Sequence, residues 1–403
     1  MAAGMVADQV ESYVSLFVGQ DIKCFWGMSE TVCGRQTIDI FLALLKAGLW
    51  ECDVRLSQFK DIYFEEIYRL SEEQAVLGLV AAGLEHMVDM KAPQAIVLQF
   101  VGQTLQMEQR NLAMNTFIGE LISKLRASDI YTLLVKGQGI AQCYERPQWR
   151  ACGDVDLFLS DDNYETAKSF LLPLASFVEK EVIATKHIGM IIDGLNVELH
   201  GSLNCGLSTR IDRCLQDIKN VIFYEGKVRS WQNGKTQVFL PSADEDAVYV
   251  FTHFLGHFYK GGIGLRQICD WCRLLWTYKE SLNYGLLESR VRKMGLMTEW
   301  KAFAAFAVDY LGMPSEAMPM YSSDKKWKRK ADKLCAFIME VGNMGHNRDM
   351  SYFEKYPYLI RKVCSMGCRC GDVIRHVRIF PLVSLRFFPY IMFNGIRSAM
   401  RGE

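Results

Sequence analysis

Two aspartates separated by a single residue carry the clearest chemical signal in the chain. Asp154 and Asp156 alternate with Val155 and Leu157, a pattern typical of a half-buried strand. Side chains two apart on a strand project from one face, so the two carboxylates share a face while the apolar pair faces the core. Neighbouring carboxylates repel each other unless a cation neutralises them, and their hard oxygens suit Mg²⁺ or Mn²⁺. A surface strand with two solvated acids fits the same spacing.

A lysine and a glycine-bearing turn precede this pair. The apolar, β-branched residues 131–135 predict a buried strand that stops at Lys136-Gly137, and a short helix is expected over residues 140–144. Backbone amides at such a turn bind phosphate, and the Lys136 ammonium adds a positive charge. The turn is therefore suited to a triphosphate.

A third group of polar residues lies on a predicted hairpin. Apolar strand patterns flank Asp193-Gly194, which is a strong hairpin signal. Glu198 and His200 share one face of the second strand, so the hairpin could add a carboxylate to the acidic pair. Three carboxylates that hold two divalent ions are what in-line nucleotidyl transfer requires. His200 could equally be a structural histidine.

Several other polar residues could have either a structural role or a role in the site. Arg150 lies just upstream of the acidic pair and could neutralise a triphosphate or form a surface salt bridge. Arg266 and Asp270 lie four apart in a predicted helix, which favours a helix-stabilising ion pair. His253 and His257 share that spacing without the acid of the zinc-protease pattern, so we expect packing or acceptor contact.

The hydrophobic period changes twice along the chain and divides it into three regions. Apolar residues recur at spacings of three and four before residue 126 and again after Pro241, whereas short β-type runs fill the middle. We therefore expect an α+β fold with a helical region 1–126, a core of mixed sheet and helices 127–240, and a helical region 241–403. Both helical regions are expected to wall a cleft over the acidic face, with the polar residues of the second helical region lining it.

Composition limits the class of protein. Half of the 403 residues are hydrophobic, so a sizeable core is possible. The thirteen cysteines are odd in number and the N-terminus has no signal-peptide pattern, which predicts reduced thiols and a cytoplasmic location. Zinc binding at Cys269 and Cys272, or at Cys364, Cys368 and Cys370, would require ligands from elsewhere.

The C-terminal part is basic although the formal net charge of the chain is zero. Residues 320–403 carry about nine more basic than acidic residues, and the run 324–330 is typical of a solvated helix face that could also meet phosphate. An arginine and two prolines interrupt the apolar segment 378–396, which disfavours a transmembrane helix. This segment could lie peripherally on a membrane or close a core.

Three separated motifs resemble the bacterial "uncharacterised nucleotidyltransferase" family, a branch of the DNA polymerase β-like superfamily. They are Leu134-Val-Lys-Gly-Gln-Gly-Ile-Ala-Gln-Cys-Tyr144, Arg150-Ala-Cys-Gly-Asp-Val-Asp-Leu157 and Val197-Glu-Leu-His200. The chain matches the family's pattern at Lys136, Gly137, Arg150, Gly153, Asp154, Asp156, Glu198 and His200. Weaker similarity extends the resemblance to about residues 40–315. The wider superfamily has Gly or Ser where this chain has Gln138.

The resemblance implies a metal-dependent nucleotidyltransferase that moves a nucleoside monophosphate from a nucleoside triphosphate to an acceptor. Mg²⁺ or Mn²⁺ would bind Asp154, Asp156 and Glu198, and Glu198 could also take the acceptor proton. The nucleotide would contact Lys136, Gly137, Arg150, Gly153 and His200. The acceptor stays open: a small molecule, a sugar, a protein side chain or an RNA end. The alternatives are an inactive relative that binds nucleotide or a partner protein, which the intact carboxylates disfavour, and a nucleic-acid-binding module, which the neutral net charge disfavours.

Overall fold

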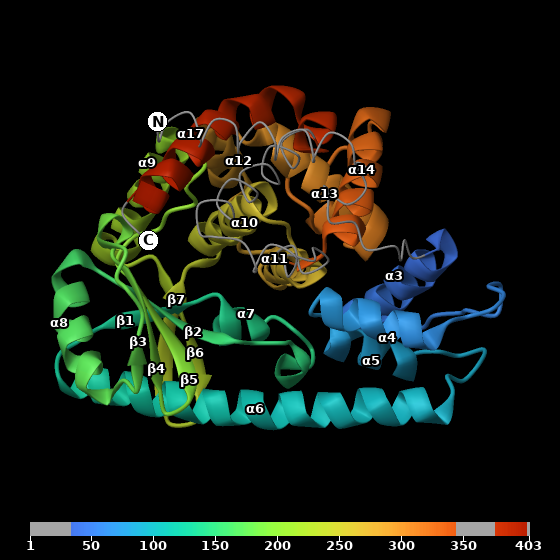
Figure 1. Ribbon diagram of the computed structural model, residues 1–403, viewed down its shortest axis with the longest axis horizontal. Helices are drawn as coiled ribbons and strands as arrows, with labels where there is room; N and C mark the ends of the chain where they lie inside the picture. Colours follow the sequence, from blue (N-terminus) through green and yellow to red (C-terminus); the bar gives the residue numbers. More distant parts are fainter. Residues whose placement is uncertain (1–33, 344–374, 401–403) are drawn as a thin grey trace, which may run out of the picture.

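The computed structural model describes residues 34–343 and 375–400 of the chain (Figure 1). It has the α+β fold expected from the sequence, with a mixed sheet between two helical parts. The N-terminal helices are α3 (Arg35–Trp50), α4 (Phe64–Glu73), α5 (Leu77–Glu85) and α6 (Gln94–Ala127). The helices after the sheet are α9 (Thr209–Tyr224), α10 (Ala243–Lys260), α11 (Leu265–Thr277), α12 (Tyr284–Met294), α13 (Met297–Leu311), α14 (Lys325–Val341) and α17 (Pro381–Met400).

The central sheet has five strands in the order β1-β2-β5-β4-β3. Its strands are β1 (Thr132–Val135), β2 (Asp154–Leu159), β3 (Phe177–Val178), β4 (His187–Ile192) and β5 (Leu195–His200). Strands β2 and β5 are parallel, and every other neighbouring pair is antiparallel. Helices α7 (Gly137–Ala141) and α8 (Asp161–Leu171) connect the early strands, and β6 (Val228–Asn233) and β7 (Thr236–Pro241) form a separate hairpin.

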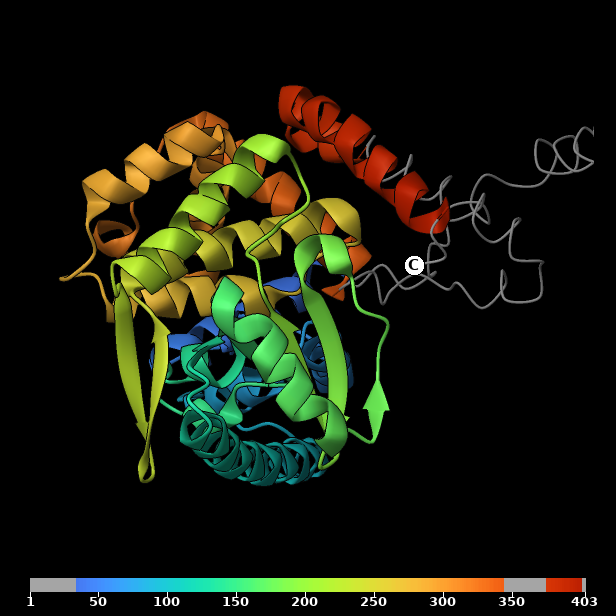
Figure 2. The same cartoon turned by 90° about the vertical axis from the view of Figure 1, so that its left-hand side faces the viewer.

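The two faces of the sheet are covered by different helices. Val155, Leu157 and Leu159 of β2 pack with apolar residues of α6 and α8. The opposite face carries Asp154, Asp156 and the buried Phe158, whose ring packs against Phe223 of α9 with centroids 4.9 Å apart. Figure 2 shows α6 below the sheet and the C-terminal helices above it. The acidic face is therefore turned toward the C-terminal helices, as expected from their apolar stripes.

Helix α6 joins the N-terminal helices to the sheet. Its 34 residues run along one side of the whole molecule (Figure 1). The C-terminal half places Met114, Ile118 and Leu125 in the core beneath the sheet, whereas Ile96 and Phe100 of its N-terminal half belong to the core of α3–α5. One continuous helix thus fixes both parts relative to each other.

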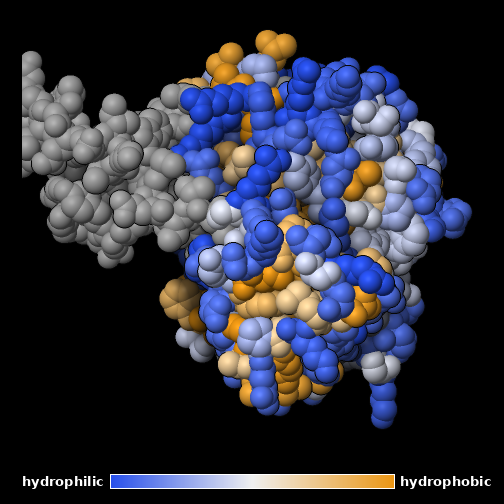
Figure 3. Space-filling model, turned by 90° about the vertical axis from the view of Figure 1, so that its right-hand side faces the viewer, coloured by the Kyte–Doolittle hydropathy of each residue, from blue (hydrophilic) through white to orange (hydrophobic). Residues whose placement is uncertain are grey.

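Part of α6 exposes apolar side chains. Leu98, Val101, Leu105 and Leu112 are between 47% and 62% exposed. Apolar side chains gather on the lower half of the face seen in Figure 3, the side on which the N-terminal half of α6 lies. The hydrophobic surface of this helix is therefore only partly used by the fold.

The apolar segment near the C-terminus forms helix α17 in spite of Pro389. Phe387 is fully buried and its ring lies 5.2 Å from that of Tyr259 on α10, so the helix covers part of the core. Among the described residues, no helix is both long and apolar enough to cross a membrane. The expected N-terminal features and the cysteine group Cys364, Cys368 and Cys370 lie outside the described residues.

Candidate active site

Parallel pairing of β2 with β5 brings the predicted acidic residues together. The register places Asp156 beside Glu198 and Asp154 beside Asn196. Because side chains alternate along each strand, all of these groups and His200 project from the same face of the sheet. The prediction that the three carboxylates share one face agrees with this register.

Asp156 is the buried centre of the site. Its Oδ1 lies 2.6 Å from Lys136 Nζ and 2.8 Å from His200 Nε2, and only 7% of its side chain is exposed. Burial alone would raise the pKa of this carboxyl, but the Lys136 ammonium and the His200 imidazole outweigh burial and hold it below its usual value. Asp156 is therefore ionised, with a cation already beside it.

Glu198 lies between two imidazoles. Its Oε2 is 3.2 Å from His187 Nε2 and 3.2 Å from His200 Nε2. Hydrogen bonds from His187 and then from His200 hold the pKa of Glu198 far below its usual value, against the effect of burial. Burial and Lys136 would lower the pKa of His200, but hydrogen bonds to Asp156 and Glu198 raise it. The site is a network of opposite charges on a partly buried face.

Asp154 lies on the same face, at the exposed beginning of β2. It is the first residue of β2, and its Oδ1 accepts a hydrogen bond from Asn196 Nδ2 at 3.3 Å. Removal from water raises its pKa, with the Glu198 and Asp156 carboxylates adding to the rise against the Asn196 hydrogen bond. Gly153 before it is exposed, with open space around it, and its expected contact with nucleotide stays a prediction.

The Lys136-Gly137 turn has a strained backbone. Lys136 has φ 56° and ψ −145°, a region that side-chain-bearing residues rarely adopt. Gly137 has φ 38°, and a Cβ there would lie 3.2 Å from the carbonyl oxygen of Asp154. The turn therefore packs closely on the start of β2, which directs Lys136 toward Asp156. The short helix was expected over residues 140–144, but α7 begins at Gly137, directly after the turn at Lys136.

The departure at Gln138 from the superfamily's pattern has a packing role. The side chain is buried, and its Nε2 donates to Asn111 Oδ1 on α6 at 2.9 Å. Asn111 Nδ2 in turn donates to the carbonyl oxygens of Gln148 and Arg150. Gln138 therefore anchors the turn to α6 and to the loop before β2.

Arg150 forms a buried ion pair. Its Nη2 and Nε lie 2.6 and 2.8 Å from the two carboxylate oxygens of Asp270 on α11, and Tyr144 also donates to Asp270 at 2.7 Å. Both charged side chains are about 5% exposed. The salt bridge that the sequence left open is therefore present, buried rather than at the surface, and contact of Arg150 with triphosphate stays a prediction. The bidentate geometry explains why Arg150 pairs with Asp270 in the interior, because the two hydrogen bonds satisfy both charges away from water.

The expected helix pair of Arg266 with Asp270 is wrong. Arg150 occupies both oxygens of Asp270, and Arg266 Nη1 donates instead to the carbonyl oxygen of Ala151 at 2.7 Å. Burial lowers the pKa of Arg266, and Arg150 adds to the effect. Arg266 therefore ties α11 to the loop that leads into the acidic strand.

Helix α10 brings a tyrosine and two histidines next to the acidic face. Lys136 acts electrostatically on Tyr249, His253 and His257. Burial raises the pKa of Tyr249 to about 12, whereas burial and then Lys136 lower the pKa of His257 to about 4. His253 Nε2 lies 3.2 Å from His257 Nε2. These side chains flank the site from the C-terminal part, where the sequence analysis expected a wall.

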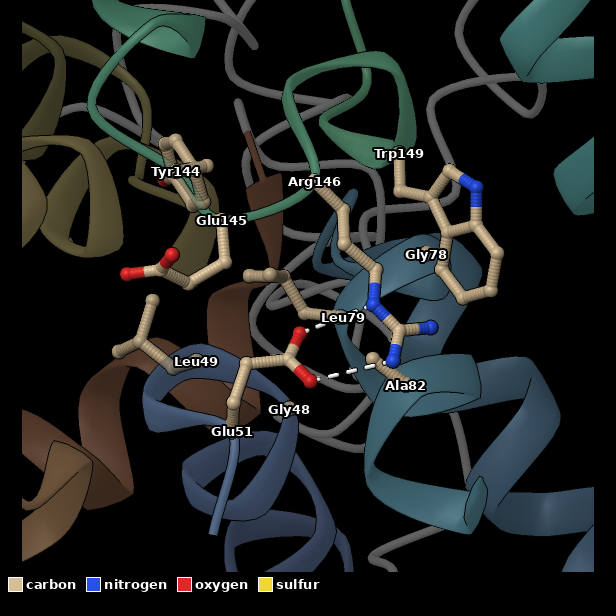
Figure 4. A pocket seen from close by; sticks show the side chains of 10 residues that line it. All are labelled: Gly48, Leu49, Glu51, Gly78, Leu79, Ala82, Tyr144, Glu145, Arg146 and Trp149. Carbon is tan, nitrogen blue, oxygen red and sulfur yellow. Dashed lines mark hydrogen bonds and ion pairs between the residues drawn. The ribbon is translucent and has the colours of Figure 1, made fainter. Parts of the chain in front are cut away.

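A small pocket lies away from this face, between α3, α5 and the loop after α7. Its lining includes Glu51, Arg146 and Trp149, and Figure 4 shows the Arg146 guanidinium directed at the Glu51 carboxylate. The Nε of Arg146 is 3.0 Å from Glu51 Oε1. This ion pair forms part of its lining, and no residue of the acidic face lines it.

The chemistry of the side chains suits a divalent ion. Asp156 Oδ1 and Glu198 Oε2 both lie within 3.2 Å of one nitrogen, His200 Nε2, and ionised carboxylates are the preferred ligands of Mg²⁺ and Mn²⁺. Among the residues that the structure describes, the one compact set of potential metal ligands is His187, Glu198 and His200. Metal binding by Asp154, Asp156 and Glu198 stays a prediction. Cys269 and Cys272 lie fully buried in α11, and burial raises the pKa of both thiols.

His187 and Tyr249 were missed by the sequence analysis. The hairpin signal at Asp193-Gly194 could have found His187, because pairing outward from a two-residue turn sets His187 opposite His200. Tyr249 has no such local signal, since its approach to Lys136 depends on how α10 packs.

Comparison with known proteins agrees with these observations. The family model described as "Uncharacterised nucleotidyltransferase" matches residues 60–312, which is more than half of the chain and includes every element of the acidic face. No curated protein and no solved structure matches the chain. The match confirms the resemblance carried by the three motifs, and the chain belongs to the uncharacterised nucleotidyltransferase family.

Proposed function

We propose that the protein is a metal-dependent nucleotidyltransferase that moves a nucleoside monophosphate from a nucleoside triphosphate to a hydroxyl-bearing acceptor. The observation that carries this proposal is the parallel register that sets Asp156 beside Glu198, with Lys136 and His200 in contact with the same carboxylate. Family membership supports the same class of reaction.

Asp154, Asp156 and Glu198 are the residues that would hold Mg²⁺ or Mn²⁺. When bound, the metal supplies charge stabilisation for the triphosphate and activation of the attacking oxygen. The low pKa of Glu198 keeps this carboxylate ionised, which favours its role as a ligand over a role as a base.

Lys136 would hold the triphosphate. Its ammonium has three donors and contacts Asp156 Oδ1, so further donors are available for phosphate oxygens. The amide of Gly137 follows at the same strained turn. Tyr249 and His253 on α10 would exclude water from the other side of the site.

A labelling experiment tests the proposal. The full chain is incubated with each α-³²P nucleoside triphosphate, Mn²⁺ or Mg²⁺ and a cell extract, and labelled products are separated. We expect a labelled acceptor with wild type and at least a hundredfold less label with Asp156→Asn, because this change removes a ligand charge while keeping the volume.

Asp193→Asn is the matched control. It makes the same chemical change on the same sheet, in the turn between β4 and β5, where Asn also tolerates the positive φ. Equal labelling by wild type and Asp193→Asn is expected. Equal labelling by wild type and Asp156→Asn would contradict the proposal.

A non-catalytic nucleotide-binding protein is the second candidate. The specific observation in its favour is that Lys136 already neutralises Asp156, so the face is stable without a metal ion. This candidate predicts that nucleotide binds wild type tightly, that binding does not depend on divalent ion, and that no acceptor is labelled.

A further inference from the structure

The hairpin of β4 and β5 sets two histidines and a glutamate on one face. His187 pairs directly with His200 across the antiparallel strands, and Glu198 lies two residues before His200 on β5. The backbone N–H and C=O of His187 both form hydrogen bonds with the backbone of Val182. The ring centroids of His187 and His200 lie 4.8 Å apart.

The ligand atoms of these residues converge. Both Nε2 atoms lie 3.2 Å from Glu198 Oε2, and the three ligand atoms all lie within 4.8 Å of one another. Ligands bound at about 2.0–2.2 Å from one ion lie about 3–4 Å apart. An ion bound by the two imidazoles and the carboxylate would replace the N–H protons at these contacts, including the proton that His200 Nε2 now shares with Asp156 Oδ1, 2.8 Å away.

We propose that His187, Glu198 and His200 form a site for a first-row transition ion, of the class of Mn²⁺, Co²⁺ or Zn²⁺, in preference to Mg²⁺. Two imidazole nitrogens with one carboxylate are borderline ligands that suit these ions, whereas Mg²⁺ favours oxygen ligands and retains its water. The side chains of His187 and Glu198 are 30% and 31% exposed, so an ion can reach them from solvent.

Lys136 determines on which side of the acidic face this ion binds. Its ammonium lies 2.6 Å from Asp156, so positive charge is already present at the β1 side of the sheet. The β4 side has Glu198 between two imidazoles, which can bind an ion as neutral ligands. The site deepens the proposed function, because it would supply one of the ions used in transfer, but its existence does not depend on turnover.

Co²⁺ binding to the full-length protein, without nucleotide, tests the site. Co²⁺ is a spectroscopic substitute whose visible absorption reports ligand type and number. We expect one equivalent to bind wild type and to resist a hundredfold excess of Mg²⁺. His187→Gln should lower the affinity at least tenfold, because it removes one of three ligands. His86→Gln is the matched control, since His86 contacts Glu51 in the N-terminal helices, and it should bind like wild type.

A cysteine variant shows whether position 187 touches the ion. His187→Cys should bind Co²⁺ with a new near-ultraviolet thiolate-to-metal band, which a merely nearby side chain would not give. This band also keeps the test valid if His187→Gln folds poorly. Absence of the band in folded His187→Cys, or equal Co²⁺ affinity of wild type and His187→Gln, would overturn the proposal, as would displacement of Co²⁺ by equimolar Mg²⁺.

Asp154→Asn separates this site from the proposed function. It should abolish transfer, because it removes a predicted ligand of the catalytic ion, and leave Co²⁺ affinity unchanged, because Asp154 contacts Asn196 rather than the histidines. Co²⁺ binding with the expected variants supports the site even if no acceptor is ever labelled. Loss of Co²⁺ binding in Asp154→Asn would contradict the placement of the ion on the hairpin.

Discussion

Lys136 is the residue on which the chemistry of the acidic face depends most. Its ammonium stabilises a buried carboxylate, and its own pKa is raised because the attraction of Asp156 outweighs the cost of burial. The backbone strain at this residue is stabilised by the surrounding packing, as is common at functional sites. In the proposed function Lys136 would bridge the acidic pair and a triphosphate.

Replacing Lys136 should weaken nucleotide binding. Lys136→Ala removes a charge-assisted hydrogen bond to phosphate, which contributes about 1.5–3 kcal/mol, so we expect the Kd for a non-hydrolysable triphosphate to rise by tenfold or more. Isothermal titration measures this Kd. An unchanged Kd in Lys136→Ala would place the triphosphate elsewhere.

At the scale of single elements, the sequence was most informative where local pattern decides the structure. Strand β1 was predicted from a continuous apolar run, β2 and β5 from period-two apolar residues, and the turn at Asp193-Gly194 from its residue types, because all of these signals act locally. The start of α7 at Gly137 was not predicted, because the glycines at 137 and 139 indicated a turn.

Long-range pairing limited the prediction of the site. Asp270 could be assigned to Arg266 from spacing along a helix, but the partner that binds it, Arg150, lies 120 residues earlier in the chain. The carboxylates were predicted to share a face, because Asp154 and Asp156 lie two apart on one strand and the turn at Asp193-Gly194 fixes the strand that carries Glu198. The contact of Lys136 with Asp156 could not be predicted from the sequence, because it depends on how the turn at Lys136 packs on β2.

The Arg150–Asp270 pair should be important for stability. Each charge is buried and would be left uncompensated if its partner were removed, at a cost of about 3–5 kcal/mol. We expect both Arg150→Met and Asp270→Asn to lower Tm by several degrees, and the double variant to lose less than the sum of the two. Additive losses would show that the two residues act independently.

Glu299 on α13 should make stability depend on pH. Burial raises its pKa to about 7, against the opposing effects of a backbone hydrogen bond and of a hydrogen bond from Tyr259 at 3.4 Å. The unfolded chain releases this proton from about pH 4.5, so the free energy of unfolding falls as pH rises from about 4.5 to 7, by on the order of 3 kcal/mol. Glu299→Gln should remove this contribution.

Thermal unfolding of wild type and Glu299→Gln at pH 5 and pH 8 measures the effect. The variant should gain stability relative to wild type at pH 8. A constant difference between the two proteins over this range would show that Glu299 titrates normally.

At the scale of the whole molecule, the sheet lies between α6 and the C-terminal helices, and its acidic face is turned toward the latter. Helix α6 fixes the N-terminal helices to the far face of the sheet, and α10 and α11 place Tyr249, His253 and Arg266 beside the near face. The sequence analysis expected both helical regions to wall the acidic face; the C-terminal helices do lie beside it, whereas α6 covers the opposite face. The three-region division at residues 126 and 240 stays a prediction, because α6 and α10 pack across both boundaries.

The comparison of α-³²P with γ-³²P labelled triphosphate tests nucleotidyl transfer at this face most directly. Nucleotidyl transfer leaves the α-phosphate on the acceptor and releases the other two phosphates, whereas phosphoryl transfer leaves the γ-phosphate. We predict that wild type labels its acceptor from the α-³²P substrate alone, and that Asp156→Asn labels it from neither. Label from the γ-³²P substrate, or α-label that persists in Asp156→Asn, would contradict the account.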